Sequence, residues 1–129
     1  MGRIRAIVAL ALGVLTLASC ASPATPALDD LRDRFVAAGG ACSQSTPRDE
    51  PFALGAVTCD EGATLVVFES TQDRADFIKL ELETNSTIRD RTHIIVSKDT
   101  WLVIDTLAVI VRVMPRMGGM ISGRNGANP

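Results

Sequence analysis

Apolar side chains first recur with a helical period, between residues 28 and 38. Charged side chains separate them, and the apolar set consists of Leu28, Leu31, Phe35 and Ala38. This spacing predicts an amphipathic helix. Thr25 and Pro26 suit its cap and first position, and Gly39-Gly40 suits its end, because glycine is frequent just after a last helical turn.

The pattern then changes to that of strands. Residues 55–59 and 63–69 are rich in apolar side chains, and the turn-forming residues Asp60-Glu61-Gly62 separate them, which predicts a first β-hairpin. The run 65–68 is apolar without alternation, so we expect a central strand that is covered on at least one face. The polar residues 43–51 include Pro47 and Pro51, and they predict an exposed loop before this hairpin.

The segment after the first hairpin has two interpretations. Ser70 or Thr71 can cap a helix, and Asp73 in its first turn favours the positive end of the helix dipole. Residues 77–83, however, alternate between apolar and charged side chains, as an edge strand would. We predict a helix because of the cap and the position after a hairpin, and the edge strand stays open as the alternative.

A second hairpin is predicted after the polar connection formed by residues 85–91. Its strands are residues 93–97 and 101–105, around the turn Lys98-Asp99-Thr100.

The last apolar segment predicts a helix that Asp105 or Thr106 caps and Pro115 stops. Its shared apolar face would hold Leu107, Ile110, Val111 and Met114. A strand over residues 107–114 stays open as an alternative, because β-branched residues are frequent there. The glycine-rich residues 118–129 predict a flexible tail.

Together these elements predict an α+β fold. The two hairpins would form a four-stranded antiparallel sheet, and about three helices would pack against it in a two-layer sandwich. This domain would cover residues 28–117, between a short extended tether at residues 20–27 and the flexible tail at residues 118–129.

The first 20 residues predict secretion and a lipid anchor. Arg3 and Arg5 precede an uncharged apolar run at residues 6–17, which is typical of a signal peptide and is shorter than the roughly 20 residues of a membrane span. The tetrapeptide Leu17-Ala18-Ser19-Cys20 resembles the lipobox of bacterial lipoproteins. The resemblance implies that residues 1–19 are removed and that Cys20 carries acyl chains such as palmitate. An ordinary signal peptide, with Cys20 near the cut by chance, is the alternative.

Two cysteines remain once Cys20 is assigned to lipid. Cys42 and Cys59 would lie in a compartment that permits oxidation, so we predict a disulfide between them. Two free thiols or a metal-binding pair are the alternatives, although the gap between them and the absence of nearby histidines do not resemble zinc spacing.

The net charge of the chain indicates which classes of partner are expected. The chain has 13 basic and 15 acidic side chains, and loss of Arg3 and Arg5 with the leader would leave a net charge of about −4. A protein that binds nucleic acid usually has a basic face, so we expect no nucleic-acid partner. No polybasic patch for lipid headgroups is apparent either, and membrane contact is expected to come from the lipid on Cys20.

The order of these features resembles a group of small actinobacterial lipoproteins of uncharacterised function. The similarity covers about residues 17 to 114 and rests on the lipobox, on Gly39 to Cys42, on Thr58-Cys59-Asp60 followed by Thr64 to Phe68, and on Trp101-Leu102-Val103. The resemblance implies a lipid-anchored α+β domain with two cysteines outside the cytoplasm, and it implies no catalytic residue, ligand or cofactor.

Residues that could perform catalysis are few. His93 is the single histidine, and Ser97 lies four residues further along the same predicted strand, roughly 13 Å away, which is too far for a catalytic pair. The paired acids at residues 29–30, 49–50 and 60–61 lie where solvated acids are common, and their spacing is not that of a calcium loop. We therefore expect no enzyme, no cofactor and no metal.

Trp101 has a functional and a structural interpretation. Tryptophan is enriched among the residues that dominate protein interfaces, so Trp101 is a possible binding residue. The alternative, which we favour, is a partly buried core side chain beside Phe68. The function expected from the sequence is a non-enzymatic, lipid-anchored envelope module that binds another protein or an envelope component through its folded face. A carrier of a small ligand or lipid, with a cavity lined by Phe52, Phe68 and Trp101, is the alternative.

Overall fold

The structure, a computed structural model, describes residues 24–122. The predicted signal peptide, Cys20 and residues 123–129 of the predicted tail lie outside the described residues. Within them the α+β class is confirmed, and the elements in chain order are α1 (Ala24–Ala37), β1 (Ser45–Arg48), β2 (Gly55–Cys59), β3 (Thr64–Val67), α2 (Thr71–Thr84), α3 (Ser86–Arg89), β4 (Ile94–Lys98), β5 (Trp101–Asp105), α4 (Leu107–Met117) and β6 (Met120–Ser122).

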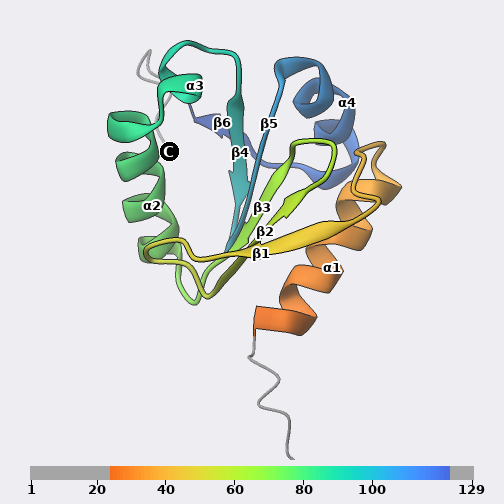
Figure 1. Ribbon diagram of the computed structural model, residues 1–129, viewed down its shortest axis with the longest axis horizontal. Helices are drawn as coiled ribbons and strands as arrows, with labels where there is room; N and C mark the ends of the chain where they lie inside the picture. The colour runs from red at the N-terminus through yellow and green to blue at the C-terminus, as the bar shows by residue number, and fades with distance from the viewer. Residues whose placement is uncertain (1–23, 123–129) are drawn as a thin grey trace, which may run out of the picture.

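The sheet has six strands in the order β1-β2-β3-β5-β4-β6, and every neighbouring pair is antiparallel (Figure 1). Both predicted hairpins are present, β2 with β3 and β4 with β5, and they meet through β3 and β5. The prediction of four strands was wrong, because one further strand is added at each edge.

Strand β1 lies within the segment that was predicted as an exposed loop. Its side chains are mostly exposed, so the strand has no apolar alternation that would reveal it. The N–H of Asp60 donates to the carbonyl of Gln44 at 2.9 Å, which places the hydrogen-bonding groups of Thr46 and Arg48 toward β2 and the nitrogen of Pro47 toward the free edge. A proline there removes no bond from the sheet, and it also removes one N–H donor from the outer edge.

Strand β6 lies within the segment that was predicted as a flexible tail. Gly118 and Gly119 have positive φ angles of 74° and 101°, and the chain turns back there from α4 toward β4. Ile121 then packs against the core, and Ser122 is buried opposite Ile95. These contacts order residues that the glycine-rich composition alone does not predict to be ordered.

Helices cover both faces of the sheet. The domain therefore has three layers, and the prediction of a two-layer sandwich was wrong. In Figure 1, α1 and α4 lie on one side of the sheet and α2 and α3 on the other. Each face has its own apolar cluster: Leu65, Val67 and Val103 point toward α1 and α4, whereas Val66, Leu102 and Ile104 point toward α2. All five residues of β5 are buried, as expected for a strand that is covered on both faces.

Helix α1 begins at Ala24, so the predicted extended tether is helical over its last four residues. Proline is tolerated in a first helical turn, which explains why Pro26 does not delay the start. At the other end, the N–H of Gly39 donates to the carbonyl of Val36 and that of Gly40 donates to the carbonyl of Phe35, at 3.0 and 2.9 Å. With φ of 108° at Gly39, this is the Schellman arrangement that the Gly39-Gly40 pair predicts.

Gly40 should be sensitive to the addition of a single methyl group. A Cβ atom there would lie 2.4 Å from the ring of Phe35, which is fully buried and cannot move freely. We expect Gly40→Ala to lower the free energy of unfolding by about 2 kcal/mol, as measured by urea denaturation. In a Phe35→Leu background the same substitution should cost less than half as much, and an equal cost in both backgrounds would contradict the proposed clash.

Helix α2 resolves the ambiguity over residues 77–83 in favour of the helix. The hydroxyl of Ser70 accepts a hydrogen bond from the N–H of Asp73 at 3.1 Å, as the predicted cap requires. Phe77 and Ile78 are buried and Leu82 is partly buried against the same cluster, so the buried face follows the helical period. The polar connection after α2 contains the short helix α3, which Asn85 caps.

Helix α4 confirms the prediction of a helix over residues 107–114. The predicted apolar face and the predicted end at Pro115 were wrong. Its buried side chains are Ile110, Val113 and Met117, whereas Leu107 and Val111 are more than half exposed, at 52% and 58%. Pro115 lies within the last turn and does not stop the helix. Its missing N–H would have bonded to the carbonyl of Val111, on the exposed side of the helix, where water can replace that bond.

Candidate functional site

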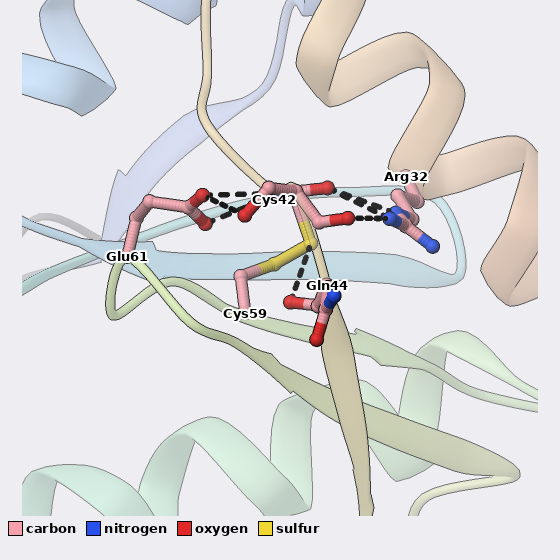
Figure 2. The surroundings of a disulfide bond; sticks show 6 residues. Arg32, Cys42, Gln44, Cys59 and Glu61 are labelled. Carbon is pink, nitrogen blue, oxygen red and sulfur yellow. Dashed lines mark hydrogen bonds between the residues drawn. A yellow bond between two sulfur atoms is a disulfide. The ribbon is translucent and has the colours of Figure 1, made fainter.

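The disulfide between Cys42 and Cys59 is present, with the two Cα atoms 4.9 Å apart. The side chain of Arg32 donates to the carbonyls of Cys42 and Ser43 at 2.8 and 2.9 Å, and on the other side the carboxylate of Glu61 accepts from the N–H and hydroxyl of Ser43 (Figure 2). The hydrogen bonds from Ser43 lower the pKa of Glu61. These contacts attach the segment after α1 to the β2–β3 turn. We therefore interpret the cluster as a structural feature that stabilises the fold.

Trp101 is a core residue. It is only 6% exposed, packs in the cluster beneath α1 and α4, and lies under the guanidinium of Arg34 at 5.6 Å from the ring centre. Phe68 belongs to the cluster on the opposite face of the sheet, where it contacts Phe77, so the expected pairing of Trp101 with Phe68 was wrong. Since Phe68 and Trp101 face opposite ways, they do not line a common cavity with Phe52.

His93 and Ser97 do not form a catalytic pair. His93 lies just before β4 with its Nδ1 atom 3.4 Å from the hydroxyl of Thr92, whereas Ser97 is buried near the other end of the strand. Burial raises the pKa of the nearby Asp105, although the N–H of Thr106 and the charge of His93 oppose this shift. Among residues 24–122, no group of three histidine, cysteine or acidic side chains could hold a metal ion.

A polar groove of about 230 Å³ lies between the sheet and the end of α2. Sequence reasoning did not find it, because its residues come from many segments of the chain. Its lining consists of Arg48, Glu50, Gly62, Thr64, Phe77, Glu81, Asn85, Thr87, His93 and Ile104.

The polar groups of the groove are largely paired with one another. Arg48 forms an ion pair with Glu50 at 2.8 Å and donates to the hydroxyl of Thr58 at 3.2 Å, while Asn85 donates to Glu81 at 2.7 Å. Burial raises the pKa of Glu50, the charge of Arg48 lowers it, and the charge of Glu81 raises it further. These side chains bond to each other and to threonines, so many of the polar groups of the groove already have partners.

A second feature lies beside the groove, at Phe52 in the turn between β1 and β2. Phe52 has a φ of 64°, in the left-handed region that a bulky side chain seldom occupies, and 48% of it is exposed. Its ring borders a hollow of about 250 Å³ on the outer side of α2. The other residues around this hollow are Asp76, Lys79, Leu80 and Glu83. The only sequence signal for this feature was a phenylalanine after a proline in a polar segment.

The backbone strain at Phe52 can be measured apart from its ring. Phe52→Gly and Phe52→Ala both remove the ring, but only glycine adopts a φ of 64° without a steric cost. We expect the glycine variant to be about 1 kcal/mol more stable than the alanine variant in urea denaturation. Equal stability of the two variants would contradict a left-handed conformation at this position.

In comparisons of the chain with protein-family models, with curated proteins and with solved structures, no match is found. None of the helices within residues 24–122 has the length and apolar character needed to cross a membrane. The resemblance to small actinobacterial lipoproteins therefore stays a prediction, and the assignment of function depends on the surfaces described above.

Proposed function

We propose that this protein is a lipid-anchored lipoprotein of the bacterial envelope that acts as a non-enzymatic binding module for another protein. The observation that carries the proposal is the exposed, left-handed Phe52 beside its hollow. A strained conformation of a bulky residue costs of order 1–3 kcal/mol, and such conformations cluster at functional sites. An exposed aromatic ring is also a frequent anchor of protein interfaces.

The orientation of the domain is compatible with an anchor at Cys20. The disulfide ties the end of α1 to the β2–β3 turn, so α1 begins at the opposite end of the domain (Figure 1). A lipid on Cys20, four residues before the first residue of α1, would hold that starting end at the membrane. The β2–β3 turn would then face away from the lipid, whereas the β1–β2 turn that carries Phe52 lies at the other end of these strands and would be on the membrane side (Figure 1).

A second candidate function is the binding of a small polar ligand, and the groove is the observation that favours it. The groove is smaller than the roughly 300–1,000 Å³ of most ligand pockets, and its charged side chains are already paired. A ligand would have to displace the Arg48–Glu50 or the Asn85–Glu81 contact. We therefore rank this function second.

Photo-crosslinking in the intact envelope tests the proposal. A photoreactive phenylalanine analogue would replace Phe52, and in a control protein it would replace Val36, which is similarly exposed at 46% on the face of α1. We expect a reproducible protein adduct from position 52 and none from position 36. Absence of any protein adduct from position 52, together with a small molecule that copurifies with the domain, would replace the proposal by the second candidate.

A further inference from the structure

We infer that a second hollow, on the membrane side of the domain, binds the head group of an anionic phospholipid. The inference rests on the lipid anchor of the proposed function, because that anchor would bring this end of the domain to the lipid surface. Three observations support it: the position of the hollow in the fold, the unused donors of Arg74, and an exposed methionine at the opening.

This hollow, which we call the Arg74 hollow, has a volume of about 360 Å³. Val67 at the end of β3 pairs with Trp101 at the start of β5, so the β4–β5 turn and the start of α2 lie at the same end of the sheet. Helix α1 also begins at this end (Figure 1). A lipid on Cys20 would therefore hold the hollow close to the membrane. Its wall includes Thr71 and Arg74 of α2, Lys98 and Asp99 at the β4–β5 turn, and Gly119 and Met120 at the start of β6.

The guanidinium of Arg74 is fixed in place and still has donors without partners. Its Nη1 atom donates to the carbonyl of Asp99 at 2.7 Å, which holds the side chain against the β4–β5 turn. Within residues 24–122, its Nε atom is buried without a hydrogen-bond partner, and Arg74 forms no ion pair at 4.0 Å or less. A buried donor without a partner is unfavourable, and a phosphate oxygen in the hollow would supply the missing acceptor. Guanidinium groups suit this role because they bind phosphate through two parallel N–H donors.

The charges around the Arg74 hollow also favour an anion. Lys98 is a second cation, and its ammonium lies beside Gly118, where an added Cβ atom would be 3.5 Å from Nζ. Among the lining residues Asp99 is the one acid, so two cations face one carboxylate. This excess attracts a phosphate, and it repels a head group that carries a cation of its own. The site should therefore prefer an anionic phospholipid to a zwitterionic one.

Met120 gives the hollow an apolar side chain that a free inorganic anion would not use. It is 60% exposed and lines the opening. Methionine is flexible and adapts to irregular apolar surfaces. On the membrane side, it can enter the boundary between head groups and acyl chains while Arg74 binds the phosphate. A phospholipid would thus contact both the cations and the thioether.

Native mass spectrometry of the mature, lipidated chain tests the inference. The protein would be released from detergent micelles that contain equal amounts of phosphatidylglycerol and phosphatidylcholine with the same acyl chains. We expect one phosphatidylglycerol adduct, about fivefold more abundant than the phosphatidylcholine adduct, which is the size of one exposed charge interaction. An excess of inorganic phosphate should not displace this lipid. The same spectra give the mass of the acyl chains on Cys20.

Matched charge variants separate a site from general attraction. Arg74→Gln/Lys98→Gln should make the two lipid adducts about equal. Lys79→Gln/Arg89→Gln removes the same charge from exposed positions outside the hollow, and it should change the preference by less than about twofold.

A single variant allows for the contact of Arg74 with the β4–β5 turn, whose loss could disturb the fold. The side chain of Lys98 is exposed and has no ion pair within residues 24–122. Lys98→Gln should therefore keep the parent melting temperature and still lower the preference for phosphatidylglycerol by about twofold.

Four results would overturn the inference. These are equal adducts of the two lipids, equal loss of preference in the two double variants, an unchanged preference in Lys98→Gln, and displacement of the lipid by inorganic phosphate. The last result would assign the hollow to free anions. The proposed function fails on different observations, namely a Cys20 without acyl mass or no protein adduct from position 52, so the two failures are distinguishable.

Discussion

Replacement of Cys20 by alanine should transfer the protein from the membrane fraction to the soluble fraction. Two or more acyl chains on Cys20 would each contribute about 0.8 kcal/mol per buried methylene, which is enough for stable anchoring, and the variant would lose all of this free energy. No helix within residues 24–122 could replace the anchor by crossing the bilayer. The measurement is fractionation of cells that express each form, followed by immunoblotting and by metabolic labelling with a palmitate analogue.

The control for this prediction is the fold itself. Cys20 lies outside the described domain, which begins at Ala24, so the circular dichroism spectrum and the melting temperature should be those of the parent. The variant Cys42→Ala/Cys59→Ala should stay in the membrane fraction, because it keeps Cys20. Persistent membrane retention of Cys20→Ala, with label still incorporated, would show that the lipid is not on this residue.

Local sequence signals predicted most of the elements correctly. The period of Leu28, Leu31 and Phe35 gave α1, and the glycine pair after it formed the predicted end. The cap at Ser70 correctly favoured a helix over an edge strand for residues 77–83, because a capped amphipathic segment after a hairpin has its own local stabilisation. These features depend on residues that are close in the sequence, where spacing carries the information.

Features that depend on distant contacts could not be predicted in the same way. Strand β1 is polar and is held by its pairing with β2 and by the disulfide near its start, neither of which leaves an apolar pattern. Strand β6 is held by β4, which lies more than 20 residues earlier. The third layer arises because α2 and α4 pack on opposite faces of the sheet. The sequence signal for that layer was the continuous apolar run of β5, which the prediction of two layers did not use.

The candidate site was the least predictable part. Trp101, which was only a possible binding residue, is in the core as the favoured interpretation predicted, and its ring packs beneath α1 and α4. Phe52 came into the prediction only as one wall of a cavity that does not form. Its exposure and left-handed backbone depend on the tight turn between β1 and β2, and β1 itself was not predicted. Because strand β1 was not predicted, the surface on which the proposed function rests could not be found from the sequence.

Loss of the disulfide should have the largest effect on stability. The bond joins residues 17 apart, and closing a loop of this size stabilises a protein by roughly 3 kcal/mol, mainly by restricting the unfolded chain. For a domain of about 100 residues, we expect reduction or Cys42→Ala/Cys59→Ala to lower the melting temperature by at least about 10 °C. Differential scanning calorimetry with and without a reductant measures this change.

A further experiment tests whether the disulfide acts on the folded state or on the unfolded chain. Arg32 and Glu61 hold the backbone at Cys42 and Ser43 from two sides, so the folded domain should keep this geometry after reduction. The unfolded chain, in contrast, expands when the cross-link is lost, and the dependence of the unfolding free energy on urea should become steeper. Arg32→Met, which removes the hydrogen bonds but keeps the disulfide, should cost only about 1 kcal/mol and leave that dependence unchanged. If reduction lowers the stability without making the urea dependence steeper, the disulfide acts mainly through contacts of the folded state, and the chain-entropy explanation is wrong for this domain.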